Sequence, residues 1–157
     1  QDRSLGRTHY SNAKSDLESE IARLTDNGYI MPEQAKSLSR DKLKTLFESD
    51  FASRMFNADK IYREIKVSSY VPVNQIEDTQ YTDSVLIQGI ADCVFEENGE
   101  LVLVDYKTDR VSSEEELLDL YKNQIAFYRK AVEKTLKKPV KEAVLYSFAL
   151  NKICIYK

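Results

Sequence analysis

Two apolar segments joined by a tight turn constrain this chain more than any other feature. The first reads VLIQGIADCVFE from residue 85 to residue 96, and the second reads ELVLVDYK from residue 100 to residue 107. Asn98-Gly99 stands between them, and this pair readily adopts the positive φ angles that a two-residue hairpin turn requires. Segments rich in Val, Ile and Leu and bounded by turn residues are typical of strands. The sequence therefore predicts an antiparallel hairpin, and a fold built around a β-sheet.

Helical spacing dominates the first third of the chain. Ser15 to Glu18 reads as a capping box that starts a first helix, and Pro32 suits the first turn of a short second one. Apolar residues then keep helical spacing, with one break near Ser49-Asp50. We expect residues 1–157 to form one domain, with a helical part over 1–58 and a core over 59–157.

The remaining segments predict three more strands and one long helix. Polar and apolar residues alternate over 61–67, and two short apolar segments at 143–149 and 153–156 predict the last strands. Two serines, each followed three residues later by Glu, predict a long helix over about 113–137, which Pro139 ends. We expect an α+β fold with a central mixed sheet of four or five strands flanked by helices.

Composition places the chain among single-domain globular proteins. Its 157 residues are 42% apolar and 31% charged, away from the disordered and fibrous classes. No apolar run approaches the roughly 18 residues that span a membrane, and no signal peptide is recognisable, so we expect a cytoplasmic protein without membrane contacts. Cys93 and Cys154 stand alone, which predicts core thiols. Because Gln1 is not an initiator Met, we expect a processed chain or a piece of a longer one.

Charge is segregated along the predicted long helix. The net charge of −3 argues against a free-standing phosphate-binding protein. Residues 111–120 nevertheless carry four acids and no base, whereas residues 121–141 carry seven bases against Glu133 alone. A solvated helix whose acidic start and basic end suit its macrodipole would show this pattern. A stripe that faces phosphates would show it equally, and the sequence leaves both interpretations open.

Charged residues stand where the second strand of the predicted hairpin ends. Asp105 and Lys107 are two residues apart and share one face of the strand, while Tyr106 points to the other face. A two-residue turn at positions 98 and 99 pairs Asp92 with Asp105. Two converging carboxylates repel each other unless a proton or a cation intervenes, and hard divalent ions prefer oxygen ligands. With an ammonium beside them, these groups suit phosphodiester hydrolysis; the alternative is a solvated strand end with ordinary salt bridges.

Three short motifs follow one another between residues 89 and 128. They are Gly89-x-x-Asp92, then Asp105-Tyr-Lys-Thr, then Gln124-x-x-x-Tyr128. In this order they resemble the RecB-like branch of the PD-(D/E)XK nucleases, and more narrowly the nuclease domains of AddA-type subunits of bacterial AddAB helicase-nucleases. The resemblance implies a restriction-endonuclease-like core. No G-x-x-x-x-G-K-[ST] sequence occurs in the chain, so ATP binding is expected outside these residues.

The resemblance also implies roles for particular residues. Asp92 and Asp105 would bind a metal ion, and the backbone carbonyl of Tyr106 would complete its shell. Lys107 would be catalytic. The remaining pair, Gln124 and Tyr128, lie one helical turn apart and would line the active site.

Histidine presents an open question. The family carries an upstream metal-ligand histidine in a G-T-x-x-H helix start. The chain's single histidine is His9, in Gly6-Arg-Thr-His9, which is one residue short of that spacing. His9 is thus either a metal ligand or a loose residue near the terminus.

For function, the resemblance implies a Mg²⁺-dependent exonuclease that acts on single strands or duplex ends of DNA, with Mn²⁺ or Ca²⁺ able to substitute in binding. It would serve an ATP-dependent helicase-nuclease in double-strand break repair and homologous recombination. Its partners would be helicase domains of the same parent chain and an AddB-like subunit. DNA is expected to run along the long helix towards Arg129, Lys130 and Lys134. The alternatives are a catalytically inactive DNA-binding or docking module, and a stand-alone RecB-like exonuclease.

Overall fold

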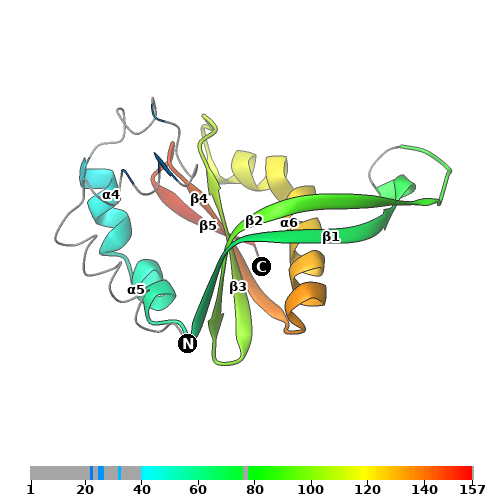
Figure 1. Cartoon of the computed structure of the whole chain (residues 1–157). Coiled ribbons are helices and arrows are strands. Elements are labelled where there is room, and N and C mark those ends of the chain that lie inside the picture. Colours follow the sequence, from blue (N-terminus) through cyan, green and yellow to red (C-terminus); the bar gives the residue numbers. More distant parts are fainter. Residues whose placement is uncertain (1–21, 23–24, 27–31, 33–39, 76–77, 157) are drawn as a thin grey trace.

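The protein forms a five-stranded sheet with helices packed against it (Figure 1). The structure is a computed structural model that describes residues 22, 25–26, 32, 40–75 and 78–156. The strands, in their order across the sheet, are β1 (Lys60–Pro72), β2 (Ser84–Glu97), β3 (Glu100–Lys107), β4 (Val140–Ser147) and β5 (Lys152–Tyr156). The helical segments are α4 (Arg40–Phe47), α5 (Asp50–Phe56), the 3-10 turn η1 (Val73–Gln75) and α6 (Glu114–Leu136). β3 and β4 pair in parallel and the other three pairs are antiparallel, which confirms the predicted α+β class with a mixed sheet.

The β2–β3 hairpin turns where the sequence predicts. Asn98 and Gly99 have φ angles of 56° and 81°, and β2 pairs with β3 from Cys93 opposite Val104 outwards to the turn. This register is the one that brings Asp92 towards Asp105. The two-residue turn, which the sequence offered as one condition for this register, is the turn that forms.

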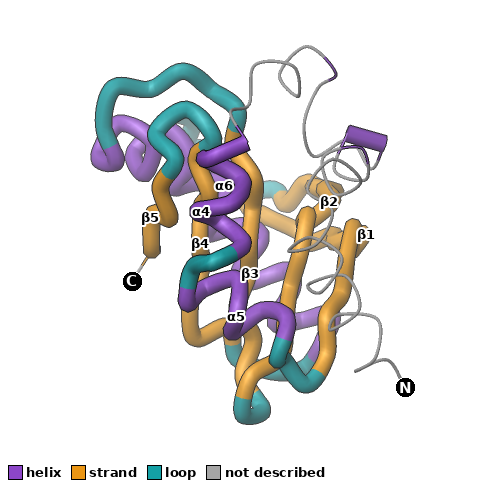
Figure 2. Tube along the Cα trace, turned by 90° about the vertical axis from the view of Figure 1, so that its left-hand side faces the viewer, coloured by secondary structure: helices purple, strands orange, loops and turns teal. Residues whose placement is uncertain are grey.

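Both faces of the sheet are covered by helices (Figure 2). One apolar cluster joins the sheet to α5 and contains Phe51, Phe95 and Val104. A second joins the sheet to α6 and contains Leu103 and Ile125. Neighbouring residues of β3 point to opposite faces, so a strand buried on both sides reads as an unbroken apolar run. Both cysteines are buried free thiols within these clusters, as predicted.

β1 and β2 continue beyond the rest of the sheet as a two-stranded arm that runs past α6 (Figure 1). The β2–β3 ladder ends at Cys93, whereas the β1–β2 ladder continues to Pro72 opposite Ser84. The predicted strand at 61–67 was therefore too short. Ser68-Ser69 gives no apolar signal, and backbone pairing with β2 rather than side-chain burial carries the strand onwards.

The side-chain alternation of β1 is interrupted at Glu64. This residue has a left-handed φ of 52°, a conformation that non-glycine residues seldom adopt. Tyr62 and Ile65, on either side of it, both pack on the α6 face. A strict two-residue period cannot place two residues three apart on one face, so the predicted alternation over 61–67 does not hold along the whole strand.

Capping residues set the helix boundaries. Ser49 caps α5, its hydroxyl accepting from the Ala52 N–H, which confirms the predicted break at Ser49-Asp50. Ser113 caps α6 by accepting from the Glu116 N–H, and the Glu116 carboxylate accepts from the Ser112 N–H. The predicted long helix is thus confirmed. The helices predicted from Ser15 and Pro32 fall almost wholly outside the described residues.

None of the described helices is long and apolar enough to cross a membrane.

Candidate functional site

Asp92 and Asp105 converge between the sheet and α6. The carboxylate of Asp92 accepts a hydrogen bond from the Tyr106 N–H, at 2.9 Å from N to Oδ2. The Asp92 and Asp105 carboxyl groups lie within hydrogen-bonding reach of each other. Asp105 is 3% exposed, unusually little for a carboxylate at the end of a strand. The structure therefore brings together the two carboxylates for which the sequence predicted a shared site.

The electrostatics of this pair favour a bound positive charge. Burial, reinforced by the charge of Asp105, raises the pKa of Asp92 to about 7, although the Tyr106 N–H and Lys107 act in the opposite direction. The Oδ2 atom of Asp105 is buried, and the group that contacts it is the Lys107 ammonium. A carboxylate pair in this situation binds a proton or a cation readily.

Lys107 is held in place from three sides. Its ammonium Nζ lies 2.5 Å from Asp105 Oδ2, donates to Gln124 Oε1 at 2.7 Å, and sits 3.8 Å from the centre of the Tyr121 ring. The residue is only 9% exposed. A lysine on a flexible four-carbon stem is thereby fixed at one position beside the carboxylates.

Tyr121 is the site residue that the sequence did not single out. Beside its ring contact with Lys107, its hydroxyl donates to Asp109 Oδ2 at 2.5 Å. Burial and Asp109 raise the pKa of Tyr121 to about 12, so the phenol stays neutral at physiological pH. The signal was available: Tyr121 precedes Gln124 by three residues and so shares its face of α6.

The ring of Tyr128 packs against the backbone of Gly89. A Cβ placed on Gly89 would lie 2.7 Å from Tyr128 Cε1, so the ring packs directly on the backbone of β2. Tyr128 is 9% exposed and belongs to the core cluster beside α6. Burial and the charges of Asp105 and Asp92 raise its pKa, which a hydrogen bond from the Ile90 backbone partly opposes. Glycine is needed three residues before Asp92 because the tyrosine of α6 occupies the space of a side chain.

The donor set fits a hard divalent cation. Two carboxylates meet there with one ammonium beside them, so a net negative charge remains when both carboxylates are ionised. No group of three or more His, Cys, Asp or Glu side chains gathers within the described residues. Mg²⁺ commonly retains several waters and needs few protein ligands. His9, the predicted further ligand, lies outside the described residues.

The three bases of α6 that were predicted to face DNA differ in their exposure to solvent. Lys130 and Lys134 are exposed, and Lys130 borders a pocket that also contains Gln124 and Tyr128. Arg129 is half-buried, and its Nε is enclosed without a hydrogen-bond partner in the part of the chain that the structure describes. Of the three, the two lysines are therefore the side chains best placed to meet a ligand in solvent.

Comparison with known proteins agrees with this geometry. A family model described as the PD-(D/E)XK nuclease superfamily matches residues 4–153. The chain belongs to the PD-(D/E)XK nuclease superfamily. The match covers the Asp92, Asp105 and Lys107 cluster together with α6, so the superfamily assignment and the site concern the same part of the chain.

Several bacterial proteins are similar to this chain. The A subunit of an ATP-dependent helicase/nuclease from Clostridium kluyveri is 38% identical over 142 residues, which are 87% of this chain and 12% of the relative. Proteins of the same name from Clostridium botulinum and Bacillus mycoides are 36% and 34% identical, over 88% and 87% of the chain and 11% and 12% of the relatives. The chain thus spans about a ninth to an eighth of the length of these curated relatives.

Proposed function

We propose that the protein is a metal-dependent deoxyribonuclease, an exonuclease that serves as the nuclease domain of an ATP-dependent helicase-nuclease. The observation that carries the proposal is the Asp92, Asp105 and Lys107 cluster: two converging carboxylates with an ammonium held beside them, in a chain of a nuclease superfamily. Hydrolysis of a phosphodiester needs a cation to offset charge on phosphate and a positioned water. Both requirements are addressed by this cluster.

Asp92 and Asp105 would hold the cation, for which we propose Mg²⁺, with the Tyr106 carbonyl and His9 as further candidate ligands. When bound, Mg²⁺ supplies Lewis acidity towards the scissile phosphate and lowers the pKa of water. The Tyr106 N–H keeps Asp92 oriented towards Asp105. The carboxylates contribute the fixed negative charge that stabilises a buried cation in this place.

Lys107 acts on the reacting phosphate. Its ammonium stabilises negative charge that develops on the phosphoryl oxygens and orients the attacking water. Gln124 accepts a hydrogen bond from the Lys107 ammonium, and the Tyr121 ring contacts the ammonium from another side. Because these contacts are in place before the substrate arrives, little reorganisation is needed in the transition state.

The relatives suggest the wider setting. They are named as components of ATP-dependent helicase/nucleases and are far longer than this chain. We therefore propose that helicase domains in the same parent chain and an AddB-like subunit deliver DNA strands to the site during double-strand break repair and homologous recombination. A motor that grips most phosphates elsewhere would leave this acidic domain in need of only a few local bases.

The test is digestion of linear DNA by the purified chain in Mg²⁺, with Lys107→Ala as the decisive variant. We expect the rate to fall by roughly 10²–10⁴, the usual contribution of such groups. Binding of Mn²⁺ should be no weaker, since a positive neighbour is lost. The matched control is Lys122→Ala on α6, whose side chain is 57% exposed and whose ammonium pairs with Asp119 away from the site.

Digestion of circular duplex DNA is measured beside that of linear DNA. An exonuclease requires strand ends, so the circular DNA should stay intact. Full activity of Lys107→Ala on linear DNA, with Lys122→Ala also active, would rule out the mechanism. No digestion by the wild-type chain, despite Mn²⁺ and DNA binding, would instead favour an inactive DNA-binding module. Metal binding is tested by calorimetric titration with Mn²⁺. The double variant Asp92→Ala with Asp105→Ala should no longer bind the ion.

A further inference from the structure

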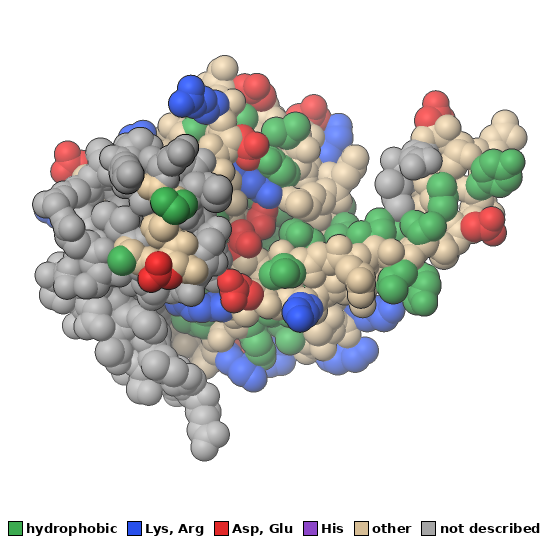
Figure 3. Space-filling model, turned by 45° about the horizontal axis from the view of Figure 1, so that its top comes forward, with side chains coloured by type: hydrophobic (Ala, Val, Ile, Leu, Met, Phe, Trp, Pro, Cys, Tyr) green, Lys and Arg blue, Asp and Glu red, His purple; other side chains and the backbone are tan. Residues whose placement is uncertain are grey.

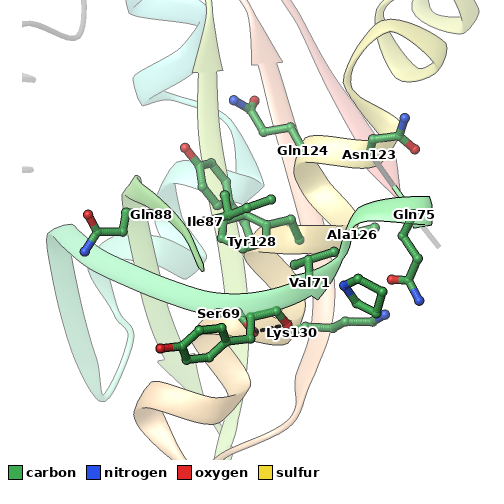
Figure 4. Close-up of a pocket in the computed structure, with 13 residues that line it drawn as sticks. Ser69, Val71, Gln75, Ile87, Gln88, Asn123, Gln124, Ala126, Tyr128 and Lys130 are labelled. Carbon is green, nitrogen blue, oxygen red and sulfur yellow. Dashed lines mark hydrogen bonds between the residues drawn. The ribbon is translucent and has the colours of Figure 1, made fainter. Parts of the chain in front are cut away.

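The β1–β2 arm has one face towards α6 and one face towards solvent. On β2, Ile87 lies on the side of Tyr128, whereas Gln88 points away from it (Figure 4). Of the two, Ile87 is half-buried and Gln88 is exposed. Opposed residues of β1 and β2 share a face, and side chains alternate along each strand. The outer face of the arm therefore carries the even-numbered residues from 66 to 72 and from 84 to 90.

Apolar and long side chains gather on this outer face. Tyr70 is opposite Leu86, and Lys66 is opposite Ile90. Tyr70 is 66% exposed, and Leu86 and Ile90 are each 51% exposed. The arm projects from the body with hydrophobic side chains along it (Figure 3). Exposed apolar surface gathered in one place commonly marks a contact with another macromolecule.

The outer edge of β1 presents main-chain groups for pairing. β1 is an outermost strand of the described sheet, and the β2–β3 ladder ends at Cys93, which leaves the arm two-stranded. The Val73 N–H donates to the Asp83 carbonyl at 2.8 Å, and in an antiparallel pair every second residue bonds to its opposite. Counting back from Val73, the N–H and C=O groups of residues 66, 68 and 70 point away from β2. A two-stranded ribbon with such an edge gains stability from a further strand.

The backbone of Ile90 agrees with this assignment. Ile90 is opposite Lys66 in the register, and its backbone bonds to the Tyr128 hydroxyl. In an antiparallel pair that is not hydrogen-bonded, both residues direct their main-chain groups away from each other. Lys66 therefore directs its N–H and C=O to the outer edge of β1.

The charges of the arm favour a second copy of the chain over DNA. β1 carries three bases and one acid, all between residues 60 and 66, whereas residues 67–71 are uncharged. Residues 73–91, which run through the tip of the arm and back along β2, carry three acids and no base. Two copies of β1 in antiparallel order place the basic end of each beside the acidic tip of the other. The same acids would repel the phosphates of DNA.

We propose that β1 is the interface of a homodimer, in which it pairs antiparallel with β1 of a second copy. Ser68 lies on the two-fold axis, opposite itself, because the same edge serves both copies in a closed dimer. Lys66 is then opposite Tyr70 of the partner subunit, so its ammonium meets the aromatic ring. Leu86 and Tyr70 of one copy thus continue a row of side chains across the interface. The carboxylate and ammonium cluster takes no part, so this inference does not rest on the proposed nuclease function.

The experiment measures the mass of the purified chain by analytical ultracentrifugation over a wide range of concentrations, in EDTA and reducing agent. We expect a reversible monomer–dimer equilibrium of low affinity, because the contact is small. Ser68→Pro removes an N–H that points away from β2, so the chain should still fold. The dissociation constant of the dimer should rise by roughly 5- to 150-fold, the value of two lost main-chain hydrogen bonds.

The matched control is Ser84→Pro. Ser84 is the first residue of β2, where proline is tolerated, and its N–H points to the other edge of the arm. This variant should dimerise as wild type does. Lys66→Glu keeps the backbone unchanged and serves as a second interface variant. It removes the contact with the ring and brings an acid towards the acidic tip, so it should also weaken the dimer.

Ser68→Cys tests the register directly. Opposed Cα atoms in a hydrogen-bonded antiparallel pair lie about 5.5 Å apart, within the range of a disulfide. Oxidation with diamide should therefore link two copies of this variant into a covalent dimer. Gln88→Cys lies on the same face but one strand further from the axis, and it should not link. Wild type gives the background, since Cys93 and Cys154 are buried.

Three results would each overturn the proposal. The first is a monomer at every concentration, which would leave the outer face of the arm for another part of the parent protein. The second is a dimer that Ser68→Pro and Ser84→Pro weaken alike, or that neither Ser68→Pro nor Lys66→Glu weakens. The third is equal disulfide linkage of Ser68→Cys and Gln88→Cys.

Discussion

At the scale of single residues, the site depends on how one ammonium is held. Lys107 is nearly buried, and its position is set by Asp105, Gln124 and the Tyr121 ring. Tyr121 is in turn fixed by its hydrogen bond to Asp109. These contacts join the end of β3 to α6, so the helix positions a group that belongs to the strand.

Replacement of Tyr121 should reveal this positioning role. Tyr121→Leu removes the aromatic face from Lys107, and we expect kcat on linear DNA to fall by roughly 3- to 30-fold, the value of a partly desolvated cation–π contact. Tyr121→Phe keeps the ring and should lose less. KM should stay nearly unchanged in both variants. A Leu variant that raised KM alone would assign Tyr121 to DNA binding instead.

Asp92 should show a conflict between stability and function. Because its ionised form is buried beside Asp105, its pKa is raised to about 7, and the folded state therefore binds a proton more tightly than the unfolded state does. The associated stability is present below the unfolded pKa of 3.8 and is lost as pH rises through about 7. Asp92→Asn should unfold at higher urea than wild type at pH 8 in EDTA, and should no longer be stabilised by Mn²⁺.

The element scale is dominated by contacts between α6 and the β1–β2 arm. Tyr128 packs on Gly89, and this contact sets how closely the helix approaches β2. A pocket of about 640 Å³ lies between the same two elements. Packing at this contact is therefore expected to control both stability and the shape of the pocket.

Gly89→Ala tests the contact. Alanine normally suits a strand better than glycine, yet its Cβ would meet Tyr128 at 2.7 Å, so we expect a loss of about 1–3 kcal/mol in the free energy of unfolding. In a Tyr128→Leu background the same change should cost far less. Urea titrations of the four proteins give the coupling, and additive effects would show that the ring moves aside freely.

A second link at this scale joins α5 to the sheet. Arg54 pairs with Glu97 of β2 at 2.9 Å and with Glu142 of β4 at 3.1 Å, and Lys141 also pairs with Glu97. The hydrogen bonds from Arg54 and Lys141 lower the pKa of Glu97 to about 2. One arginine thus connects a helix to two separate strands.

This link predicts a pH dependence of stability. The pKa of Glu97 is depressed in the folded state, so its stabilising effect is complete above the ordinary value of 4.5 and is lost as pH falls towards 2. Arg54→Gln should lower the melting temperature at pH 7 and flatten its decline over that acidic range. Lys122→Gln, which removes an exposed pair, serves as the control. Parallel pH profiles for wild type and Arg54→Gln would exclude the assignment.

At the scale of the whole molecule, the proposed DNA path depends on two exposed bases of α6. Lys130 and Lys134 are exposed on α6 one turn apart, on the helix that carries Gln124 and Tyr128. They follow the acidic first turn of α6. The charge order suits the helix macrodipole, and it also leaves the basic half of the helix beside the pocket.

The salt dependence of DNA binding tests this path. Lys130→Gln with Lys134→Gln should weaken binding to all sequences and lower the slope of log affinity against log salt by roughly 1.4–1.8, as expected for two phosphate contacts. Lys122→Gln with Lys152→Gln removes two exposed lysines elsewhere. Should the control pair change the slope as much, DNA would follow another route.

Local chemistry made much of this fold predictable. Asn98-Gly99 favours positive φ, which predicts the turn, and a two-residue turn at this place gives the register that brings Asp92 towards Asp105. The cap at Ser113 and the alternating faces of β3 are likewise properties of short stretches of chain. Such features depend on neighbours in sequence, so periodicity and turn chemistry suffice to predict them.

Contacts between distant segments were decided only by the tertiary structure. The arm extends past Val67 because β1 keeps pairing with β2, although none of the β1 residues there is buried. Tyr121 contacts Lys107, and Tyr128 occupies the space beside Gly89. Both contacts depend on the position at which α6 packs on the sheet. The sequence motifs included Gly89 and Tyr128 but did not include Tyr121. Their distances depend on the packing of whole elements, which no local pattern encodes.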